Sequence, residues 1–358
     1  MSFQKKVKKE ASAPIEKGAG YSALVQELLK RFPERSREIV LIRFGIGGEK
    51  KKTLEQIGKE YSITRERVRQ VIDALLKNLR QTITQETEHP LIKKIYEVLE
   101  KEHGIVPTEN LLDTLAKDSA QERGALQVLL QSLPSVKVIK ETKEYRESVI
   151  LSDFSMSQWK KIISLVEKLF SEKNEIHSLA ELEKVLAAEL SKENLTPEKL
   201  GSYLAPSFLI ERNVFGRYGL SHWSAIRPRG TRERAYLVLK TLGRPLHFRE
   251  IARLIDEHGL YRTGKKTHPQ TVHNELIKDK RFVLVGRGTY ALALWGYKRG
   301  TVREVLSDIL KSGDKPMTKE ELLEAVMKVR QVKKSTVIIN LNTFFTKVGK
   351  NIYTLGKA

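Results

Sequence analysis

Apolar and polar positions separate most sharply between residues 53 and 80. Thr53, with Gln56 three residues later, predicts the start of a helix, because this spacing allows a capping box. Ser62 and Ile63 predict a short turn, after which Thr64 is placed to cap a second helix. At helical spacing, the second helix has one apolar side, formed by Val68, Val71, Ile72, Leu75, Leu76 and Leu79. The pattern predicts a helix-turn-helix whose second helix packs on its domain through that side.

The opposite side of the second helix carries guanidinium, carboxylate and amide groups, formed by Arg65, Glu66, Arg69, Gln70 and Asp73. A guanidinium fork matches the two acceptors of guanine, which favours Arg69 or Arg65 as a base contact. Glu66 can accept a hydrogen bond from a cytosine amino group, and Gln70 can pair with adenine. A solvated, charged helix face is the alternative interpretation.

The same segment resembles region 4 of primary bacterial sigma factors. The runs 43–46 (Arg-Phe-Gly-Ile), 53–58 (Thr-Leu-Glu-Gln-Ile-Gly) and 64–70 (Thr-Arg-Glu-Arg-Val-Arg-Gln) carry the resemblance, which covers roughly residues 24–80. In that family this helix recognises the promoter −35 element. The resemblance therefore implies base-contact positions for four residues and a position nearer the DNA backbone for Arg67; the four are Arg65, Glu66, Arg69 and Gln70.

Three lysines, Lys50, Lys51 and Lys52, lie in the loop before the helix-turn-helix, where primary sigma factors are usually less basic. Together with Thr64 at the start of the second helix, they are predicted to contact DNA phosphates. A solvated loop is the open alternative for the lysines.

After residue 89 an internal repeat predicts tandem small domains. Segment 216–223 resembles segment 288–295, with Tyr218 matching Tyr290 and Trp223 matching Trp295, and a shorter version occurs at 349–355. Each copy predicts three helices followed by two short strands around a glycine turn, which is a winged helix. We expect these tyrosines and tryptophans to be hairpin residues packed on the helices, and not platforms for stacking bases.

The sequence thus predicts a mainly α chain of six segments. A disordered basic tail spans 1–20, and a helix-turn-helix, which we call the head, spans 24–82. Four winged-helix-like segments follow, which we call the first to fourth modules, at 90–151, 155–226, 228–298 and 299–358.

The third module carries a second resemblance. The runs 234–236 (Arg-Ala-Tyr) and 245–252 (Pro-Leu-His-Phe-Arg-Glu-Ile-Ala), with Gly288, Tyr290 and Leu292, resemble a HARE-type winged helix. That module also occurs in the delta subunit of some bacterial RNA polymerases, in restriction systems and in chromatin proteins. The resemblance implies a nucleic-acid context without fixing a function. The fourth module resembles this type more faintly.

In the third module, a recognition helix is predicted from about residue 268 to 278, with Pro269 in its first turn. Val272, Leu276 and Ile277 are its expected core side. The candidate DNA contacts lie before the helix, on its outward side and in the hairpin: Lys265, Lys266, Gln270, His273, Asn274 and Arg287. A basic surface that contacts protein is the alternative.

Charge is concentrated at both ends of the chain, whose formal net charge is +21 at pH 7. Residues 228–298 hold 15 Lys and Arg against six Asp and Glu, and residues 299–358 hold 12 against six. Residues 90–227, in contrast, hold 19 against 20. The expected partner is double-stranded DNA, and the neutral middle favours protein contact or spacing.

Other classes of function find little support. There is no cysteine, and His258, His268 and His273, the only close histidine group, lack metal-binding helical spacing, so no metal or cofactor is expected. The sequence contains no nucleophile elbow, P-loop or catalytic carboxylate motif, so neither an enzyme nor a small-molecule substrate is expected. No apolar run approaches a membrane span, and the N-terminal lysines precede no apolar signal segment, so a cytoplasmic, nucleoid-associated protein is expected.

Two hypotheses follow. The first is a transcription regulator that recognises a −35-like element, docks on the RNA polymerase core, or does both. It is not expected to be a complete sigma factor, because an aromatic-rich promoter-melting region is missing before the head and the first tryptophan is Trp159. The second is a DNA-binding scaffold of a restriction, repair or chromatin-like system that recruits an enzyme. RNA binding is a third and weaker hypothesis, because side chains cannot enter the narrow major groove of an A-form helix.

Overall fold

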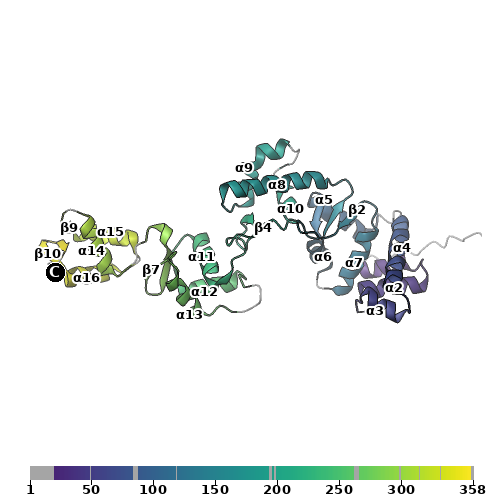
Figure 1. Cartoon of the computed structure of the whole chain (residues 1–358), viewed down its shortest axis with the longest axis horizontal. Coiled ribbons are helices and arrows are strands. Elements are labelled where there is room, and N and C mark those ends of the chain that lie inside the picture. Colours follow the sequence, from purple (N-terminus) through teal and green to yellow (C-terminus); the bar gives the residue numbers. More distant parts are fainter. Residues whose placement is uncertain are drawn as a thin grey trace, which may run out of the picture. The chain divides into compact units, whose positions relative to one another are not determined.

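The computed structural model is mainly helical with small antiparallel sheets, which confirms the predicted fold class (Figure 1). It describes residues 20–48, 50–83, 88–117, 119–192, 196, 199–261, 266–297, 300–313, 315–330 and 332–355. The predicted basic tail, up to residue 19, lies outside these ranges. Within them, no helix is both long and apolar enough to cross a membrane.

The head consists of four helices: α1 (Tyr21–Leu29), α2 (Glu34–Phe44), α3 (Leu54–Glu60) and α4 (Arg65–Ile83). The capping box predicted at Thr53 is present, since its side chain accepts from the Gln56 amide and the Gln56 side chain accepts from the Thr53 amide. Gly45 ends α2 in a left-handed conformation, which glycine adopts without strain. Local sequence signals therefore set the limits of these helices.

The first module follows the winged-helix order of helices and strands. Its elements are α5 (Pro90–Lys101), β1 (Ile105–Pro107), α6 (Thr108–Ala116), α7 (Ala120–Ser132), β2 (Val136–Ile139) and β3 (Ser148–Leu151). The sheet is antiparallel with β3 in the centre. Its buried residues join those of the head in a single hydrophobic core that runs from Tyr21 to Val149. The head and the first module are thus one packed body.

The joint between the head and the first module depends on α7. A methyl group at Gly124 of α7 would lie only 2.0 Å from the carbonyl oxygen of Phe44 at the end of α2. The absence of a side chain therefore lets the two helices approach closely. Two residues earlier on α7, the Glu122 carboxylate accepts from the amides of Tyr21 (2.6 Å) and Ser22 (3.2 Å), the first residues of α1. These are amides that a helix cannot satisfy internally.

A second connection comes from α4. Arg80 donates to the carbonyl oxygens of Pro134 (2.6 Å), which lies between α7 and β2, and of Val136 (3.3 Å), the first residue of β2. The same helix that presents the candidate DNA contacts is therefore bonded at its far end to the first module.

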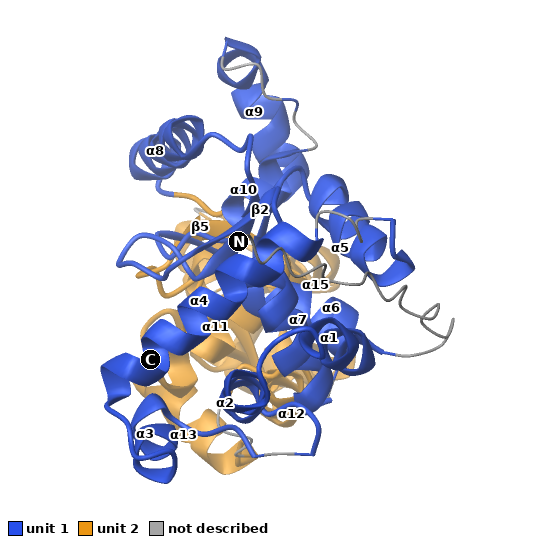
Figure 2. Cartoon of the chain, turned by 90° about the vertical axis from the view of Figure 1, so that its right-hand side faces the viewer, with its two compact units in different colours: residues 1–174, 179–211 blue, residues 175–178, 212–358 orange. Residues whose placement is uncertain are grey.

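The second module contains α8 (Met156–Lys173), α9 (Leu179–Lys192), α10 (Leu200–Leu204), β4 (Ile210–Arg212) and β5 (Tyr218–Leu220). Trp159 on α8 is buried and donates to the Tyr203 carbonyl oxygen at 2.8 Å. The chain divides into two compact units, residues 1–174 with 179–211 and residues 175–178 with 212–358, and this division passes through the second module (Figure 2).

The hairpin of the first module, between β2 and β3, is engaged within the chain. Tyr145 forms a β-bridge with Ser207, and Arg146 donates to the carbonyl oxygens of Ala205 (3.1 Å) and Ser207 (2.5 Å). Arg146 also forms an ion pair with Glu211 at 2.7 Å. This hairpin therefore joins the first module to residues 205–211.

The third module has its own core. Its elements are α11 (Gly230–Leu242), β6 (Leu246–His247), α12 (Phe248–Glu257), α13 (Pro269–Lys278), β7 (Phe282–Gly286), β8 (Thr289–Leu292) and the 3-10 turn η2 (Ala293–Trp295). Strand β8 lies between β6 and β7. Tyr290 on β8 is buried and Trp295 packs against the same core, as predicted. Trp295 was predicted to be a hairpin residue, which is wrong: it lies in η2, just after the hairpin. Ile277 was predicted in the core, which is wrong: it is 61% exposed, because the turn of α13 carries it past the buried side that holds Leu276.

The fourth module repeats this order with a separate core. Its elements are α14 (Val302–Ser312), β9 (Met317–Thr318), α15 (Lys319–Val329), α16 (Lys334–Phe344), β10 (Phe345–Gly349) and β11 (Ile352–Leu355). Strand β11 lies between β10 and β9, and Tyr353 on β11 is buried like Tyr290. The repeat seen in the sequence thus corresponds to a repeated packing arrangement.

Candidate nucleic-acid interface

Helix α4 separates a buried side from an exposed one. Its apolar residues are buried, apart from the half-buried Val71: Val68, Ile72, Leu75, Leu76 and Leu79. The four predicted base-contact residues are all exposed in its first two turns: Arg65, Glu66, Arg69 and Gln70. Thr64 accepts from the Arg67 amide at 3.1 Å, so it caps the helix as predicted. The amino-terminal half of α4 is thereby open to a partner.

The exposed side chains of α4 are ordered by contacts with one another. Arg69 binds the Glu66 carboxylate through Nε (3.0 Å) and a terminal nitrogen (2.6 Å), and it binds Asp73 with its other terminal nitrogen at 2.6 Å. Gln70 accepts from Arg67 at 3.3 Å. The hydrogen bond from Arg69 lowers the pKa of the Glu66 carboxyl, so Glu66 is a hydrogen-bond acceptor at neutral pH.

Asp73 is the residue that the sequence prediction placed on the polar side without a role. Its spacing of four residues from Arg69 allows the two to pair on a helix, and this signal was available in the sequence. Glu66 and Asp73 together use three of the five N–H donors of Arg69, which leaves one hydrogen on each terminal nitrogen for a base contact.

The loop lysines differ in their surroundings. Lys50 and Lys51 are exposed, as expected for phosphate contacts. Lys52 is half-buried and forms an ion pair with Glu60 of α3 at 2.8 Å. Its backbone carbonyl also accepts from Arg43 at 3.1 Å. Lys52 therefore ties the loop to the head, whereas Lys50 and Lys51 face solvent.

A groove of about 290 Å³ lies beside the exposed side of α4, between the head and the first module. Its wall includes Arg43, Lys51 and Arg69 from the head, and Val138 and Glu147 from the first module. The candidate DNA-contacting surface of α4 thus borders a neighbouring module that is fixed to it by the common core.

In the third module, four of the six candidate contacts are exposed: Lys266, Gln270, Asn274 and Arg287. Lys265 lies outside the described residues. His273 was expected to point outward and is instead half-buried, with Nδ1 3.0 Å from the Tyr290 hydroxyl oxygen and its ring stacked near Phe248. The buried tyrosine hydroxyl needs a polar partner, which explains this orientation.

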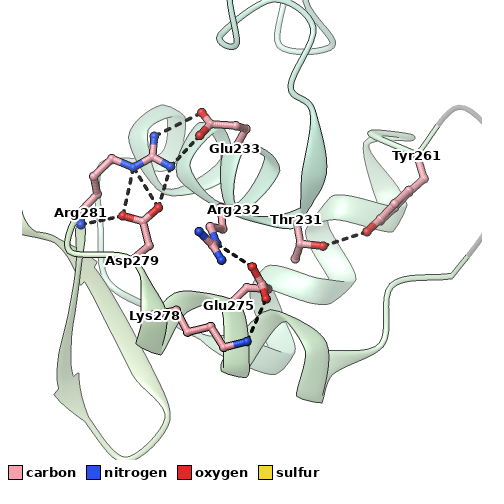
Figure 3. Close-up of polar contacts among 8 residues, drawn as sticks. All are labelled: Thr231, Arg232, Glu233, Tyr261, Glu275, Lys278, Asp279 and Arg281. Carbon is pink, nitrogen blue, oxygen red and sulfur yellow. Dashed lines mark hydrogen bonds and ion pairs between the residues drawn. The ribbon is translucent and has the colours of Figure 1, made fainter.

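Several cations of the third module are paired with its own carboxylates (Figure 3). Arg281 binds Glu233 of α11 at 2.6 Å and Asp279 at 2.7 Å. Hydrogen bonding from Arg281 lowers the pKa of the Asp279 carboxyl, and the two carboxylates raise the pKa of Arg281. These contacts fasten the start of α11 to the turn between α13 and β7.

A second set of ion pairs in the third module involves α13 itself. Glu275 accepts from Arg232 of α11 at 2.6 Å and lies 3.6 Å from Lys278, and the Arg232 hydrogen bond lowers the pKa of the Glu275 carboxyl (Figure 3). Arg232 and Arg281 are therefore engaged by carboxylates of their own module and are less available to DNA phosphates. In the described part of the chain, no group of three or more His, Cys, Asp or Glu side chains is placed to hold a metal ion.

Two family models match the chain. Residues 28–81 match "Sigma-70, region 4". Residues 231–295 match the HARE-HTH family, a helix-turn-helix domain whose description names ASXL and a restriction endonuclease. Both resemblances stated from the sequence are therefore confirmed. The matches fall on the head and on the third module, the two places where candidate recognition helices were identified.

Several RNA polymerase sigma factors match the N-terminal segment of the chain. The RNA polymerase sigma factor SigA of Clostridium acetobutylicum is 38% identical over 74 residues, which are 20% of this chain and 19% of that protein. RpoS of Coxiella burnetii is 42% identical over 62 residues (17% and 18%), and RpoD of Helicobacter pylori is 42% identical over 59 residues (16% and 9%). The chain thus spans less than a fifth of each of these relatives. Together, the exposed face of α4 and the two helix-turn-helix matches support a DNA-binding role.

Proposed function

We propose that this chain is a sequence-specific DNA-binding transcription regulator that recognises its target with α4 of the head. The observation that carries this proposal is the exposed row of Arg65, Glu66, Arg69 and Gln70 on a capped helix whose other side is buried. A helix of this kind fits the major groove, where each base pair presents a distinct pattern of donors and acceptors. Its match to sigma region 4 favours a −35-like element as the target.

The RNA polymerase core is the proposed protein partner. The relatives of the head are named as RNA polymerase sigma factors, which makes a polymerase-bound role the natural extension of the match. Promoter opening is not part of the proposal, since the described part of residues 90–355 forms winged-helix-type modules. A cytoplasmic location on the nucleoid accompanies this role.

A scaffold of a restriction, repair or chromatin-like system is the second candidate. The observation that favours it is the match of residues 231–295 to a domain family that includes a restriction endonuclease. Co-purification of the full chain separates the two functions. A regulator brings the polymerase core with it, whereas a scaffold brings a nuclease or another DNA-processing enzyme.

Selection of bound sequences from a random duplex pool, followed by Arg69→Ala, tests DNA recognition. Removal of one bidentate base contact is expected to weaken binding to the selected sequence on the order of ten- to a hundredfold and to relax one base position. Arg67→Ala is the matched control, because removal of a phosphate-binding side chain from the same helix weakens binding to all sequences alike. An equal effect of Arg69→Ala on selected and random DNA contradicts base recognition by this residue.

A further inference from the structure

The fourth module separates its charges along the chain. From residue 331 to the end there is no Asp or Glu, and there are five lysines. This stretch contains α16 and the β10–β11 hairpin, the elements that correspond to a recognition helix and a wing. All six carboxylates of the module precede it in the sequence.

The described carboxylates of α14 and α15 are largely occupied. Glu304 and Glu321 accept from the amides of Thr301 and Thr318, closing the capping boxes of the two helices. These hydrogen bonds lower the pKa of both carboxyls, which keeps them charged. Glu324 forms an ion pair with Lys328 at 2.9 Å. Two of these carboxylates therefore cap helices, and the third is paired with a lysine of its own helix.

The lysines of α16 and its hairpin are placed differently. Lys333, Lys334, Lys347 and Lys350 are all exposed, and none is within ion-pair distance of a carboxylate among the residues that the structure describes. In the third module, by contrast, Arg232 and Arg281 are held by carboxylates of the same module. Cations without partners are the ones free to neutralise phosphates.

Helix α16 lies beside strand β10 of the hairpin (Figure 1). Lys347 pairs with Tyr353 across the β10–β11 ladder, and paired residues project from the same face of a sheet. The Tyr353 hydroxyl donates to the Asn342 side chain on α16 at 2.7 Å, so that face is turned toward the helix. Lys347 therefore lies on the side of the hairpin that adjoins α16.

One row of exposed side chains on α16 is suited to the major groove of DNA. Ser335, Ile339 and Thr343 recur every four residues and are exposed, Ile339 to 63%. Hydroxyls can bond phosphates or base edges, and an aliphatic side chain can contact a thymine methyl. Asn342 falls on the same face, seven residues after Ser335, but its side-chain oxygen already accepts from the Tyr353 hydroxyl. The row otherwise lacks Arg, Gln and carboxylate groups, which make the strongest distinctions between bases.

We propose that α16 and the β10–β11 hairpin form a second DNA-binding surface, which holds the phosphate backbone of a duplex with little choice of sequence. The proposal rests on the DNA-binding role proposed above and adds a division of labour to it. The head selects a sequence and the fourth module adds affinity through Lys333, Lys334, Lys347 and Lys350. The B-form major groove admits a helix, whereas the A-form groove of RNA does not, so DNA is the expected polymer.

The test uses the full chain with four lysines replaced by glutamine: Lys333→Gln, Lys334→Gln, Lys347→Gln and Lys350→Gln. Binding to a random-sequence duplex is measured over a range of salt concentrations. Each phosphate contact contributes about 0.9 to the slope of log affinity against log salt, so the slope is expected to fall by about 3 to 4. At low salt, the affinity for random DNA is expected to fall at least tenfold. The bases selected by the head are expected to stay the same.

A charge-matched control replaces four lysines elsewhere in the same module, namely Lys311→Gln, Lys315→Gln, Lys319→Gln and Lys328→Gln. It changes the net charge equally and is expected to leave most of the slope intact. Equal losses for the two variants, no loss for either, or a loss that appears only in protein capture or on duplex RNA each overturns the proposal. Failure of Arg69→Ala to alter sequence choice bears on the head alone, so the two proposals fail separately.

Discussion

The head and the first module bury one hydrophobic core together, whereas the third and fourth modules each bury their own. In the shared core, α7 contacts helices of the head through Gly124 and Glu122, and α4 reaches the first module through Arg80. In the third module, ion pairs such as Arg281 with Glu233 connect elements of that same module. The same type of small domain is thus used in two ways along one chain.

This difference bears on the DNA-binding roles proposed for the head and the fourth module. A recognition helix fixed to a second domain keeps one geometry, which suits selection of a sequence, because base contacts depend on accurate placement. A module with its own core and exposed lysines needs no fixed register, which suits backbone binding. The comparison therefore predicts that the shared core matters for specificity and that the C-terminal modules matter for affinity.

The largest effect on the comparison is expected from Gly124→Ala. Alanine favours a helix interior over glycine by about 1 kcal/mol, so helix propensity alone predicts a gain in stability. The added methyl group, however, would lie only 2.0 Å from the Phe44 carbonyl oxygen and force α7 away from α2. We expect a net loss of about 1–3 kcal/mol in the free energy of unfolding, as for other overpacked cores. The loss of stability is measured from the hydrogen exchange of backbone amides in α2, α4 and α7 of the full chain.

Gly313→Ala is the control for that substitution, because its added methyl group would meet only ordinary contacts in the fourth module. It is expected to leave exchange in α4 unchanged. Slower exchange in α4 and α7 of the Gly124→Ala protein would mean that the head and the first module are not packed at this point.

A smaller effect is expected from Arg80→Met, which keeps an apolar stem and removes the donors to Pro134 and Val136. Loss of these bonds leaves two carbonyl groups without this partner, at a cost of about 1–2 kcal/mol. The free energy of opening of the β2 region, from hydrogen exchange, is the readout. Lys77→Met on the exposed side of α4 is the control. If the two variants behave alike, Arg80 does not join the two parts.

Local rules account for most of what the sequence predicted correctly. The Thr53 and Gln56 spacing defines a capping box, and the apolar period of α4 identifies its buried side, since both depend on neighbours within one or two turns. The exposure of Arg65, Glu66, Arg69 and Gln70 follows from the same period. Repetition of whole segments likewise predicted the mainly helical, winged-helix-like fold class.

Contacts between distant segments were beyond such rules. Gly124 is an ordinary helix residue until α2 is placed against it, 80 positions away in the chain. Ile277 and His273 lie at the edges of the buried side of α13, where periodicity cannot decide between core and solvent; one is exposed and the other is turned to Tyr290. The domain limits and the DNA-contact roles remain predictions.

The smallest effect is expected from Asp279→Asn in the third module. The Asp279 carboxyl has a lowered pKa because Arg281 donates to it, so its charged form stabilises the fold above the unfolded-state pKa and this stabilisation disappears as the pH falls through the lower, folded-state pKa. At pH 7 the substitution is expected to cost about 1 kcal/mol or less, since Arg281 is partly exposed and keeps Glu233. The wild type and the variant should then converge once the pH has fallen below the lowered, folded-state pKa of Asp279. Glu257→Gln removes a carboxylate from an exposed pair with Arg253 in the same module and serves as the control. Protection of α11 and α13 against hydrogen exchange, corrected for the intrinsic rate at each pH, measures the difference; a gap between wild type and variant that persists in acid would mean that Asp279 acts through packing and not through its charge.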